Sequence, residues 1–307
     1  MGGGSWTSSS WSSFSSAHVA GRSRASIFSS IGMKDEYDAA KIVRRESVDS
    51  PDNPQSTPII VGIDVTGSMG ELAERLIVKG LDTTFTELLK RRPVTDPHVM
   101  AMAIGDAFTD SASCQATQFE ADIRIAKQLT ELYLEGGGGA NEGESYSLAH
   151  AFAGLKTVHD SFSKRGRKGF LFTVGDEPVL DGVTKEQLSR VLGVEAQSGL
   201  SARDCVDLAS RTYEVFHIIV DGSYARHNLA GVKRTWDPLL PQRVIHLRDP
   251  GKLSETIVST IEMVAGRDRA SVVGSWDKST ALVVAEATKD LAFGGGRPGG
   301  GLRRLGA

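Results

Sequence analysis

The sequence has few cysteines and no long apolar run. Cys114 and Cys205 are the only two among 307 residues, far apart and without metal-type spacing, which argues against a disulfide-built secreted domain. No window approaches the roughly 18 consecutive apolar residues of a membrane span. The N-terminus lacks the apolar core of a secretory signal. We therefore expect a cytoplasmic protein without a membrane partner.

The chain also lacks a charge excess and the commonest enzyme motifs. Its formal net charge is −3, so no broad basic field predicts binding to nucleic acid. A G-x-S-x-G elbow, an H-E-x-x-H helix, a Walker loop and a G-x-G-x-x-G turn after a strand are all missing. The four glycines at 136–139 are not followed by the Lys-Ser/Thr pair that phosphate cradling requires. These absences do not favour an enzyme.

Composition divides the chain into four segments. Residues 1–33 are rich in Ser and Gly and have too few apolar residues to offset the entropy of ordering, which predicts a disordered arm. Residues 34–56 form a polar lead-in that ends in a turn-rich run. Residues 57–266 carry the folded domain. Residues 267–307 form a C-terminal extension with a Gly-rich, mildly basic tail.

Strands alternate with helices along the folded domain. The apolar runs predict strands at 57–65, 98–106, 116–122, 168–178, 215–223 and 242–250. Amphipathic segments predict helices at 70–92, 125–135, 144–162, 184–193, 201–214 and 252–266. Continuous apolar strands that alternate with helices are typical of an α/β fold, here a Rossmann-like, doubly wound, mostly parallel central sheet with helices on both faces.

Polar residues follow the first strand in an unusual pattern. Asp64, Thr66 and Ser68 alternate within "DVTGSMG", so their side chains can converge on one point as the chain leaves the sheet. In open α/β sheets the ligand crevice lies beyond the carboxyl ends of the strands. Carboxylate and hydroxyl oxygens suit a hard cation such as Mg²⁺. The alternative is an Asp cap and an ordinary turn, which the motif alone does not exclude.

The same residues resemble a known family. "DVTGSM" resembles the D-x-S-x-S signature of von Willebrand factor A domains, and the resemblance covers about residues 57–266. It implies a metal-ion-dependent adhesion site in which Asp64, Thr66 and Ser68 contact Mg²⁺ or Mn²⁺ directly or through water. Thr66 stands where Ser is commoner in the family. Asp176, in "FLFTVGDEP", matches the later metal-binding Asp of the family.

One loop departs from the family pattern. The family usually supplies a Thr from a Gly-rich loop, whereas "GGGGANEGES" contains none. It resembles the variant of β-subunit integrins, in which a Glu binds the metal directly. That alignment implies Glu144 as the ligand and Asn141 as a neighbour. A second alignment places Ala140 there and leaves the position without a side-chain ligand; both stay open.

The resemblance implies a protein-binding module. A partner protein would present an Asp or Glu to the metal, and cytoplasmic relatives imply an AAA+ ATPase or a multiprotein assembly as that partner. A structural component that self-associates through the N-terminal arm, with a metal that only stabilises loops, is the alternative. A Mg²⁺-dependent hydrolase is disfavoured, because Thr66 stands where haloacid-dehalogenase phosphatases carry their acid–base Asp. We expect Asp106, Asp110 and Asp221 to be turn or cap residues, with nothing paired to Asp221.

Overall fold

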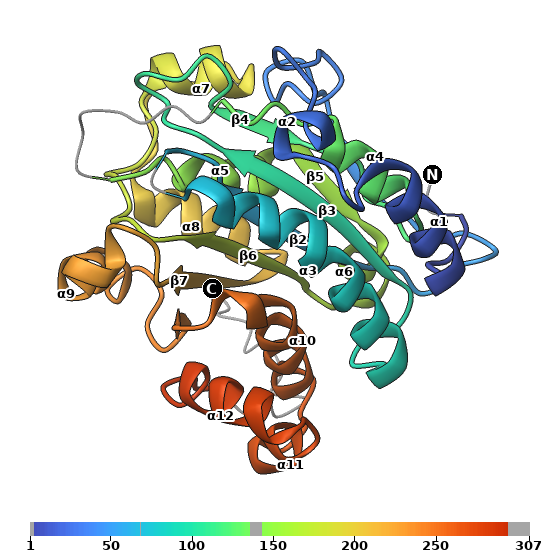
Figure 1. The fold of residues 1–307 in the computed structure, drawn as a ribbon. Coiled ribbons are helices and arrows are strands. Elements are labelled where there is room, and N and C mark those ends of the chain that lie inside the picture. The colour runs from blue at the N-terminus through green and yellow to red at the C-terminus, as the bar shows by residue number, and fades with distance from the viewer. Residues whose placement is uncertain (1–2, 68, 136–142, 294–307) are drawn as a thin grey trace, which may run out of the picture.

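The structure is a computed structural model that describes residues 3–67, 69–135 and 143–293. Its centre is a six-stranded sheet in the order β4-β3-β2-β6-β7-β8 (Figure 1). The strands are β2 (Thr57–Asp64), β3 (Pro97–Ile104), β4 (Cys114–Ala116), β6 (Gly169–Gly175), β7 (Tyr213–Val220) and β8 (Val244–Leu247). All neighbours pair in parallel except β4, which runs antiparallel to β3 at the edge. The predicted fold class is confirmed.

Helices cover both faces of this sheet. They are α3 (Gly70–Arg91), α4 (Arg124–Thr130), α5 (Ser147–Lys156), α6 (Asp160–Arg165), α7 (Lys185–Leu192), α8 (Ala202–Ser210), α9 (Ala225–Trp236) and α10 (Leu253–Val264). One apolar core lies beneath α3, α4 and α10 and includes Phe85 and Ile257. The other lies beneath α5, α7, α8 and α9 and includes Phe152 and Trp236. Every helix in the described part of the chain is too short or too polar to cross a membrane.

The side chains of β2 point alternately to the two apolar cores, which explains why the strand is a continuous apolar run. Ile59 and Ile63 belong to the first core, whereas Ile60 belongs to the second. Successive side chains of a strand point to opposite faces. A strand covered by helices on both sides must therefore be apolar at nearly every position, as β2, β3, β6 and β7 are.

The N-terminal arm is ordered against the domain. Helix α1 (Ser8–His18) begins with the side chain of Thr7 as its N-cap, and α2 (Arg24–Ile27) follows. Trp6 is buried and stacks on Phe85 of α3, with ring centroids 4.5 Å apart. Trp11 and Phe14 pack against the same core. The arm differs from the disorder expected for residues 1–33, because its few aromatic side chains meet an apolar surface that the rest of the chain provides.

Most predicted boundaries differ by a few residues, and two predicted elements differ in kind. The helix expected at 144–162 is divided, because β5 (Thr157–His159) pairs in parallel with β1 (Arg45–Ser47) and separates α5 from α6. The strand expected at 116–122 is wrong: β4 ends at Ala116, and beyond it only Glu120 forms an isolated bridge, to Val99. A two-stranded sheet and an edge strand both depend on pairing with distant residues, which the local apolar pattern does not report.

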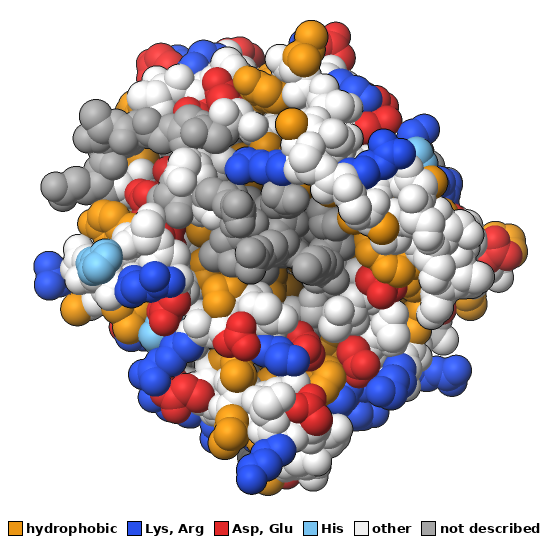
Figure 2. Space-filling view, viewed as in Figure 1, with side chains coloured by type: hydrophobic (Ala, Val, Ile, Leu, Met, Phe, Trp, Pro, Cys, Tyr) orange, Lys and Arg blue, Asp and Glu red, His pale blue; other side chains and the backbone are white. Residues whose placement is uncertain are grey.

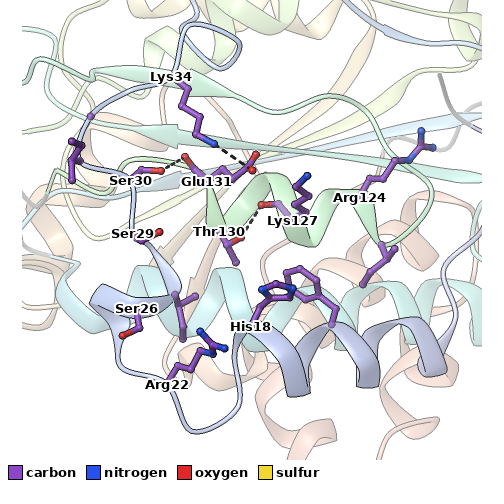
Figure 3. Close-up of a pocket in the computed structure, with 15 residues that line it drawn as sticks. His18, Arg22, Ser26, Ser29, Ser30, Lys34, Arg124, Lys127, Thr130 and Glu131 are labelled. Atoms are coloured by element: carbon purple, nitrogen blue, oxygen red, sulfur yellow. Dashed lines mark hydrogen bonds and ion pairs between the residues drawn. The ribbon is translucent and has the colours of Figure 1, made fainter.

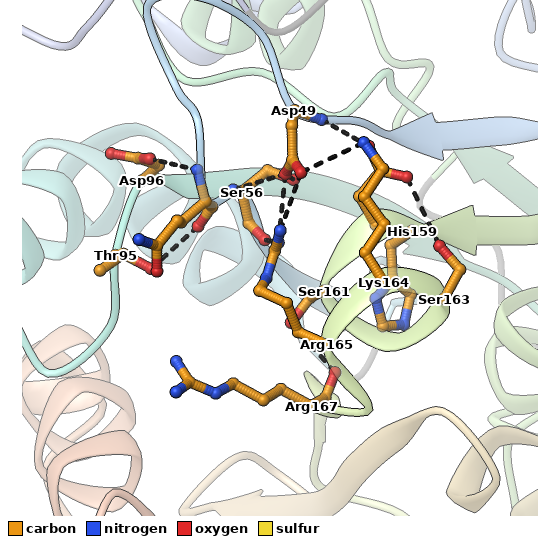
Figure 4. A network of polar contacts seen from close by, with 12 residues as sticks. Asp49, Ser56, Thr95, Asp96, His159, Ser161, Ser163, Lys164, Arg165 and Arg167 are labelled. Atoms are coloured by element: carbon orange, nitrogen blue, oxygen red, sulfur yellow. Dashed lines mark hydrogen bonds and ion pairs between the residues drawn. The ribbon is translucent and has the colours of Figure 1, made fainter.

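The lead-in is fixed by a polar network beside β2 (Figure 4). The Asp49 carboxylate accepts hydrogen bonds from Nη1 and Nη2 of Arg165, at 2.8 and 3.1 Å, and from the Ser56 hydroxyl at 2.9 Å. The Arg165 guanidinium holds the pKa of Asp49 well below its usual range. A bidentate Arg–carboxylate pair of this kind gives geometric specificity. It ties the residues before β2 to α6.

At the other end of the chain, α11 (Arg269–Gly274) and α12 (Lys278–Ala287) follow a short 3-10 turn, η1 (Pro250–Lys252), and α10. Val272 of α11 and Val284 of α12 form a small core with Met263 of α10. Both helices begin at an Asp whose side chain accepts backbone N–H bonds, Asp268 and Asp277. The described part of the C-terminal extension therefore packs on the domain near β8.

Candidate functional site

Two of the predicted ligands follow neighbouring strands at their carboxyl ends. Ile63 of β2 lies opposite Val174 of β6, and the strands are parallel. Asp64, the last residue of β2, and Asp176, just after β6, therefore emerge side by side. Neither carboxylate is exposed to solvent. The structure thus brings together the two acidic residues that the sequence placed after separate strands.

The Asp64 carboxylate is held by its own loop and by a tyrosine. Its Oδ1 accepts hydrogen bonds from the backbone N–H of Thr66 at 2.9 Å and from the Thr66 hydroxyl at 2.6 Å. Its Oδ2 accepts a hydrogen bond from the Tyr146 hydroxyl at 3.0 Å. The bonds from Thr66 make an Asx turn, which is one reason why Asp and Thr occur two residues apart at a strand end.

Asp176 is covered by the loop between β7 and α9. Its Oδ2 accepts a hydrogen bond from the backbone N–H of Tyr224 at 2.7 Å. A Cβ atom on Gly222 would lie 2.3 Å from the same oxygen. Only a glycine at position 222 allows the loop to approach this closely. Neither Gly222 nor Tyr224 was singled out in the sequence, where Gly222 falls near the end of the strand expected at 215–223.

Glu144 is fixed beside the Asp176 loop by its backbone. Its N–H donates to the carbonyl of Pro178 at 2.9 Å, and its carbonyl accepts from the N–H of Leu180 at 3.2 Å. Its side chain is buried, with 3% of its surface exposed, and Oε2 has no hydrogen-bond partner among the described residues. A buried carboxylate oxygen without a partner is costly. Glu144 is therefore the described residue of this site that most clearly needs a further ligand.

Burial and mutual repulsion raise the pKa values of the Asp64 and Glu144 carboxyl groups. Burial is the main cause that raises the pKa of Asp64, and the nearby charge of Asp176 raises it further. Burial likewise raises the pKa of Glu144, with added repulsion from Asp64, Glu177 and Asp106. No Lys or Arg side chain that the structure describes forms an ion pair with Asp64 or Glu144. Without a cation, the raised pKa values favour the protonated forms of Asp64 and Glu144, because no described counter-charge stabilises their carboxylates.

Tyr146 was not expected from the sequence. It is fully buried, and its hydroxyl donates to Asp64 and accepts a weak hydrogen bond from the backbone N–H of Glu177 at 3.5 Å. A Cβ atom on Gly175 would lie only 1.9 Å from that hydroxyl. The last residue of β6 must therefore be glycine for Tyr146 to reach Asp64. No motif in the sequence signals this arrangement.

The remaining acidic residues at the strand ends have local partners. Asp106 accepts hydrogen bonds from the Phe108 N–H at 2.8 Å and the Thr109 hydroxyl at 3.0 Å. Asp110 accepts one from the N–H of Asp106 at 2.9 Å. These are the turn roles expected for both residues. Asp221 differs from the expectation, because its Oδ1 lies 2.7 Å from Nε2 of His246 on β8. That pairing joins two strands and cannot be read from local sequence.

Some predicted positions are not placed. Ser68, Asn141 and Ala140 lie outside the described residues, so the two alignments of the Gly-rich loop stay open. In the part of the chain that the structure describes, no three His, Cys, Asp or Glu side chains form a group that could hold a metal ion. A cation would need hydroxyl or water oxygens in addition to carboxylates.

The chemistry of the described side chains fits a hard cation. Asp64, Asp176 and Glu144 offer carboxylate oxygens, and Thr66 offers a hydroxyl. Mg²⁺ takes oxygen ligands, commonly with only one or two protein carboxylates and several waters. The unpartnered Oε2 of Glu144 is the observation that favours an added ligand here.

Comparisons with known proteins find similarity only among solved structures. No protein-family model matches the chain, and neither does any of the curated proteins searched. Pilus adhesin SpaC from Lactobacillus rhamnosus GG aligns with 72% of this chain and 30% of its own, at a TM-score of 0.43 and 8% identity. A von Willebrand factor type A structure from Catenulispora acidiphila aligns with 70% of this chain and 44% of its own, at a TM-score of 0.37 and 16% identity.

Proximal thread matrix protein 1 from the mussel byssus aligns with 67% of this chain and 47% of its own, at a TM-score of 0.41 and 12% identity. The chain spans less than half the length of each of these three structures. The neighbours thus include a von Willebrand factor A domain and an adhesin at low identity. With TM-scores below 0.5, these likenesses carry no argument about function or about a metal.

Proposed function

We propose that this chain is a protein-interaction module that holds Mg²⁺ or Mn²⁺ at the carboxyl ends of β2 and β6. The observation that carries the proposal is the buried Glu144 carboxylate, whose Oε2 has no partner within the described part of the chain, beside the buried Asp64. Burying negative charge without compensation is expensive. A divalent cation would supply the missing charge.

One or two of the carboxylates of Asp64, Glu144 and Asp176 would bind the ion directly. The remaining carboxylate and the Thr66 hydroxyl would act through water, since no three described acidic side chains form a metal-binding group. Ser68 belongs to the same proposal through the motif. Two further groups would keep the ligands in place. The Tyr146 hydroxyl orients Asp64, and the Tyr224 N–H orients Asp176. When bound, the cation would supply an electrophilic position for a carboxylate oxygen of a partner protein.

The surroundings of the site suit a protein partner. Phe108, in the loop after β3, has 61% of its surface exposed. The neighbouring Ala107 N–H donates to the Ser145 hydroxyl, next to Glu144, at 3.0 Å. An exposed aromatic side chain beside a polar anchor is typical of an interface hot spot. A partner that presents an Asp or Glu would contact both the bound metal and Phe108. An AAA+ ATPase or a subunit of a multiprotein assembly would be such a partner.

We propose no enzymatic activity for this site. The Thr66 hydroxyl donates to Asp64 at 2.6 Å and occupies the position at which a haloacid-dehalogenase phosphatase needs a carboxyl acid–base. A hydroxyl cannot take over that proton transfer near neutral pH.

Metal-dependent stabilisation tests the proposal. Mg²⁺ or Mn²⁺ at millimolar concentration should raise the Tm of the full chain, because a ligand that binds only the native state stabilises it by mass action. Asp64→Asn should abolish this rise and leave the metal-free protein equally or more stable, since one repelling charge is removed. Asp181→Asn, at an exposed position in the segment between β6 and α7, is the matched control and should respond like the wild type.

A pull-down with and without EDTA tests the partner. Capture should require the metal and should be lost in Asp64→Asn but kept in Asp181→Asn. If Asp64→Asn keeps the full rise in Tm with Mg²⁺, the metal site is refuted. If metal binds but EDTA does not release the partner, coordination of a partner carboxylate is refuted.

A further inference from the structure

A cavity unrelated to the predicted ligands lies between the N-terminal arm, α4 and the lead-in (Figure 3). Its volume is about 940 Å³, and an adjoining cavity of about 290 Å³ shares Arg124, Lys127 and Glu131 with it. We call the two together the basic cleft. Its basic lining residues are His18, Arg22, Lys34, Arg45, Arg124 and Lys127. Ligand pockets commonly have volumes of about 300–1,000 Å³, so the cleft has the size of a small-molecule site.

Charge in the basic cleft is predominantly positive. Residues 1–34 contain no Asp or Glu, so the arm adds no negative charge to the cleft. Glu131, one of two acidic lining residues, accepts a hydrogen bond from the Tyr37 hydroxyl at 2.5 Å and pairs with Lys34 at 3.3 Å. Several Lys and Arg side chains and a His border this part of the surface in Figure 2. Glu131 is therefore paired directly with Lys34 and attracts Lys127 without forming an ion pair with it.

Three of the lining cations have no ion pair within the described part of the chain: Arg22, Arg45 and Lys127. Lys127 is exposed on α4. Among the described residues, Arg22 donates only to the carbonyl of Ala17, at 2.6 Å. Arg124, by contrast, already pairs with Glu120 at 3.0 Å and Asp122 at 2.9 Å. The unpaired cations come from three different segments that meet at the cleft.

Arg45 is the most informative of them. Only 6% of its surface is exposed, and it donates through Nη2 to the carbonyls of Glu36 and Ala116, while its buried Nε has no partner in the described part of the chain. Backbone carbonyls satisfy part of its hydrogen-bonding capacity but do not cancel its charge. Glu36, the other acidic lining residue, attracts Arg45 without forming an ion pair with it, so the buried charge is compensated only in part. Such a charge is unfavourable unless a ligand or solvent completes the compensation. The cavity beside Arg45 offers room for such a ligand.

We propose that the basic cleft binds a small polyanion that carries phosphate or carboxylate groups. Arg45 would supply fixed positive charge at the inner end of the cleft. Lys127 and Arg22 would contact the anion from α4 and from the arm. Guanidinium and ammonium groups both bind phosphate and carboxylate oxygens through charge-assisted hydrogen bonds. The arm would then form one wall of a binding site.

Titration calorimetry on the full chain tests the proposal. Pyrophosphate and citrate serve as probes, without divalent cations and at matched ionic strength, so that the candidate metal site does not contribute. At least one probe should bind saturably and raise the Tm. The stronger of the two identifies phosphate or carboxylate as the preferred group.

Two surface variants keep the test independent of folding. Lys127→Gln and Arg22→Gln should each weaken binding about tenfold, since one charge-assisted contact is lost. The control, Lys278→Gln, changes an exposed Lys on α12, near the opposite edge of the sheet, and should leave binding unchanged. The proposal is overturned if neither probe binds saturably, or if neither cleft variant weakens binding. If a poly-Glu peptide binds but neither probe does, the proposal that the ligand is a small molecule is overturned.

Discussion

The buried His150 should make this protein lose stability as the pH falls from about 6.5 to about 4. The side chain is fully buried in α5, at the edge of the Trp236 ring with centroids 6.0 Å apart, and neither ring nitrogen has a hydrogen-bond partner. Burial lowers the pKa of His150 from 6.5 to about 4. Its folded-state pKa thus lies below that of the unfolded chain, so the unfolded state binds more protons in this range.

The magnitude follows from the two pKa values. The His150 imidazole has a pKa near 6.5 in the unfolded chain and about 4 in the folded protein. Lowering the pH from about 8 to about 5 should therefore reduce the free energy of unfolding by about 2 kcal/mol. His150→Leu removes the titrating group and also the two unpartnered nitrogens. The variant should therefore equal or exceed the wild type in stability at about pH 8, and its advantage should grow by about 2 kcal/mol at about pH 5.

Urea unfolding at both pH values measures this difference directly. Other buried groups are present in both proteins and largely cancel in the comparison. The exception is His217, whose pKa is lowered by burial and also by His150, so its own cost at low pH is smaller in the variant and adds to the variant's advantage. His227→Gln changes an exposed histidine of α9 and should follow the wild type. Equal losses of stability in the wild type and His150→Leu between the two pH values would refute the reasoning, because the ring would then be protonated without cost.

Two further substitutions test the packing around the site and the arm. Gly175→Ala should cost about 3 kcal/mol of unfolding free energy, because the new Cβ would collide with the Tyr146 hydroxyl. Chemical denaturation measures this cost, and Gly274→Ala, which meets no atom within 4 Å, should be nearly neutral. Trp6→Ala should cost about 3 kcal/mol and speed proteolysis of the arm, because the stack on Phe85 is lost, whereas the exposed Ser12→Ala should change neither. An arm equally resistant to protease in Trp6→Ala would show that the stack does not hold it.

Local pattern was sufficient wherever burial on both faces forced a simple composition. The runs that became β2, β3, β6 and β7 contain apolar residues at nearly every position, which few other structures tolerate. The alternation of these strands with amphipathic helices then allowed the doubly wound fold to be predicted. Since parallel strands share one carboxyl edge, the positions of Asp64 and Asp176 next to each other could also be predicted.

Composition was a poor guide to the arm and to the divided helix. Residues 1–33 are too polar to fold alone, yet Trp6 and Phe14 pack on a surface formed mainly by α3 and α4. Thr157 lies in β5 and not in a continued helix, because Arg45 provides a strand partner from the lead-in. In both cases the deciding contacts join residues far apart in the chain, and local propensity is only a weak constraint on such segments.

The sequence by itself determined the fold class and the edge of the sheet at which Asp64, Thr66 and Asp176 would lie, because residue periodicity and strand direction are local properties. Only the tertiary structure decided which groups surround them. It brought Tyr146 to Asp64, closed the Gly222 loop over Asp176, and left Oε2 of Glu144 buried without a partner. It also gave Asp221 its partner His246 and placed Arg45 beside a cavity. Burial and pairing set the energy of a charge, and both depend on residues that the chain brings together only when it folds.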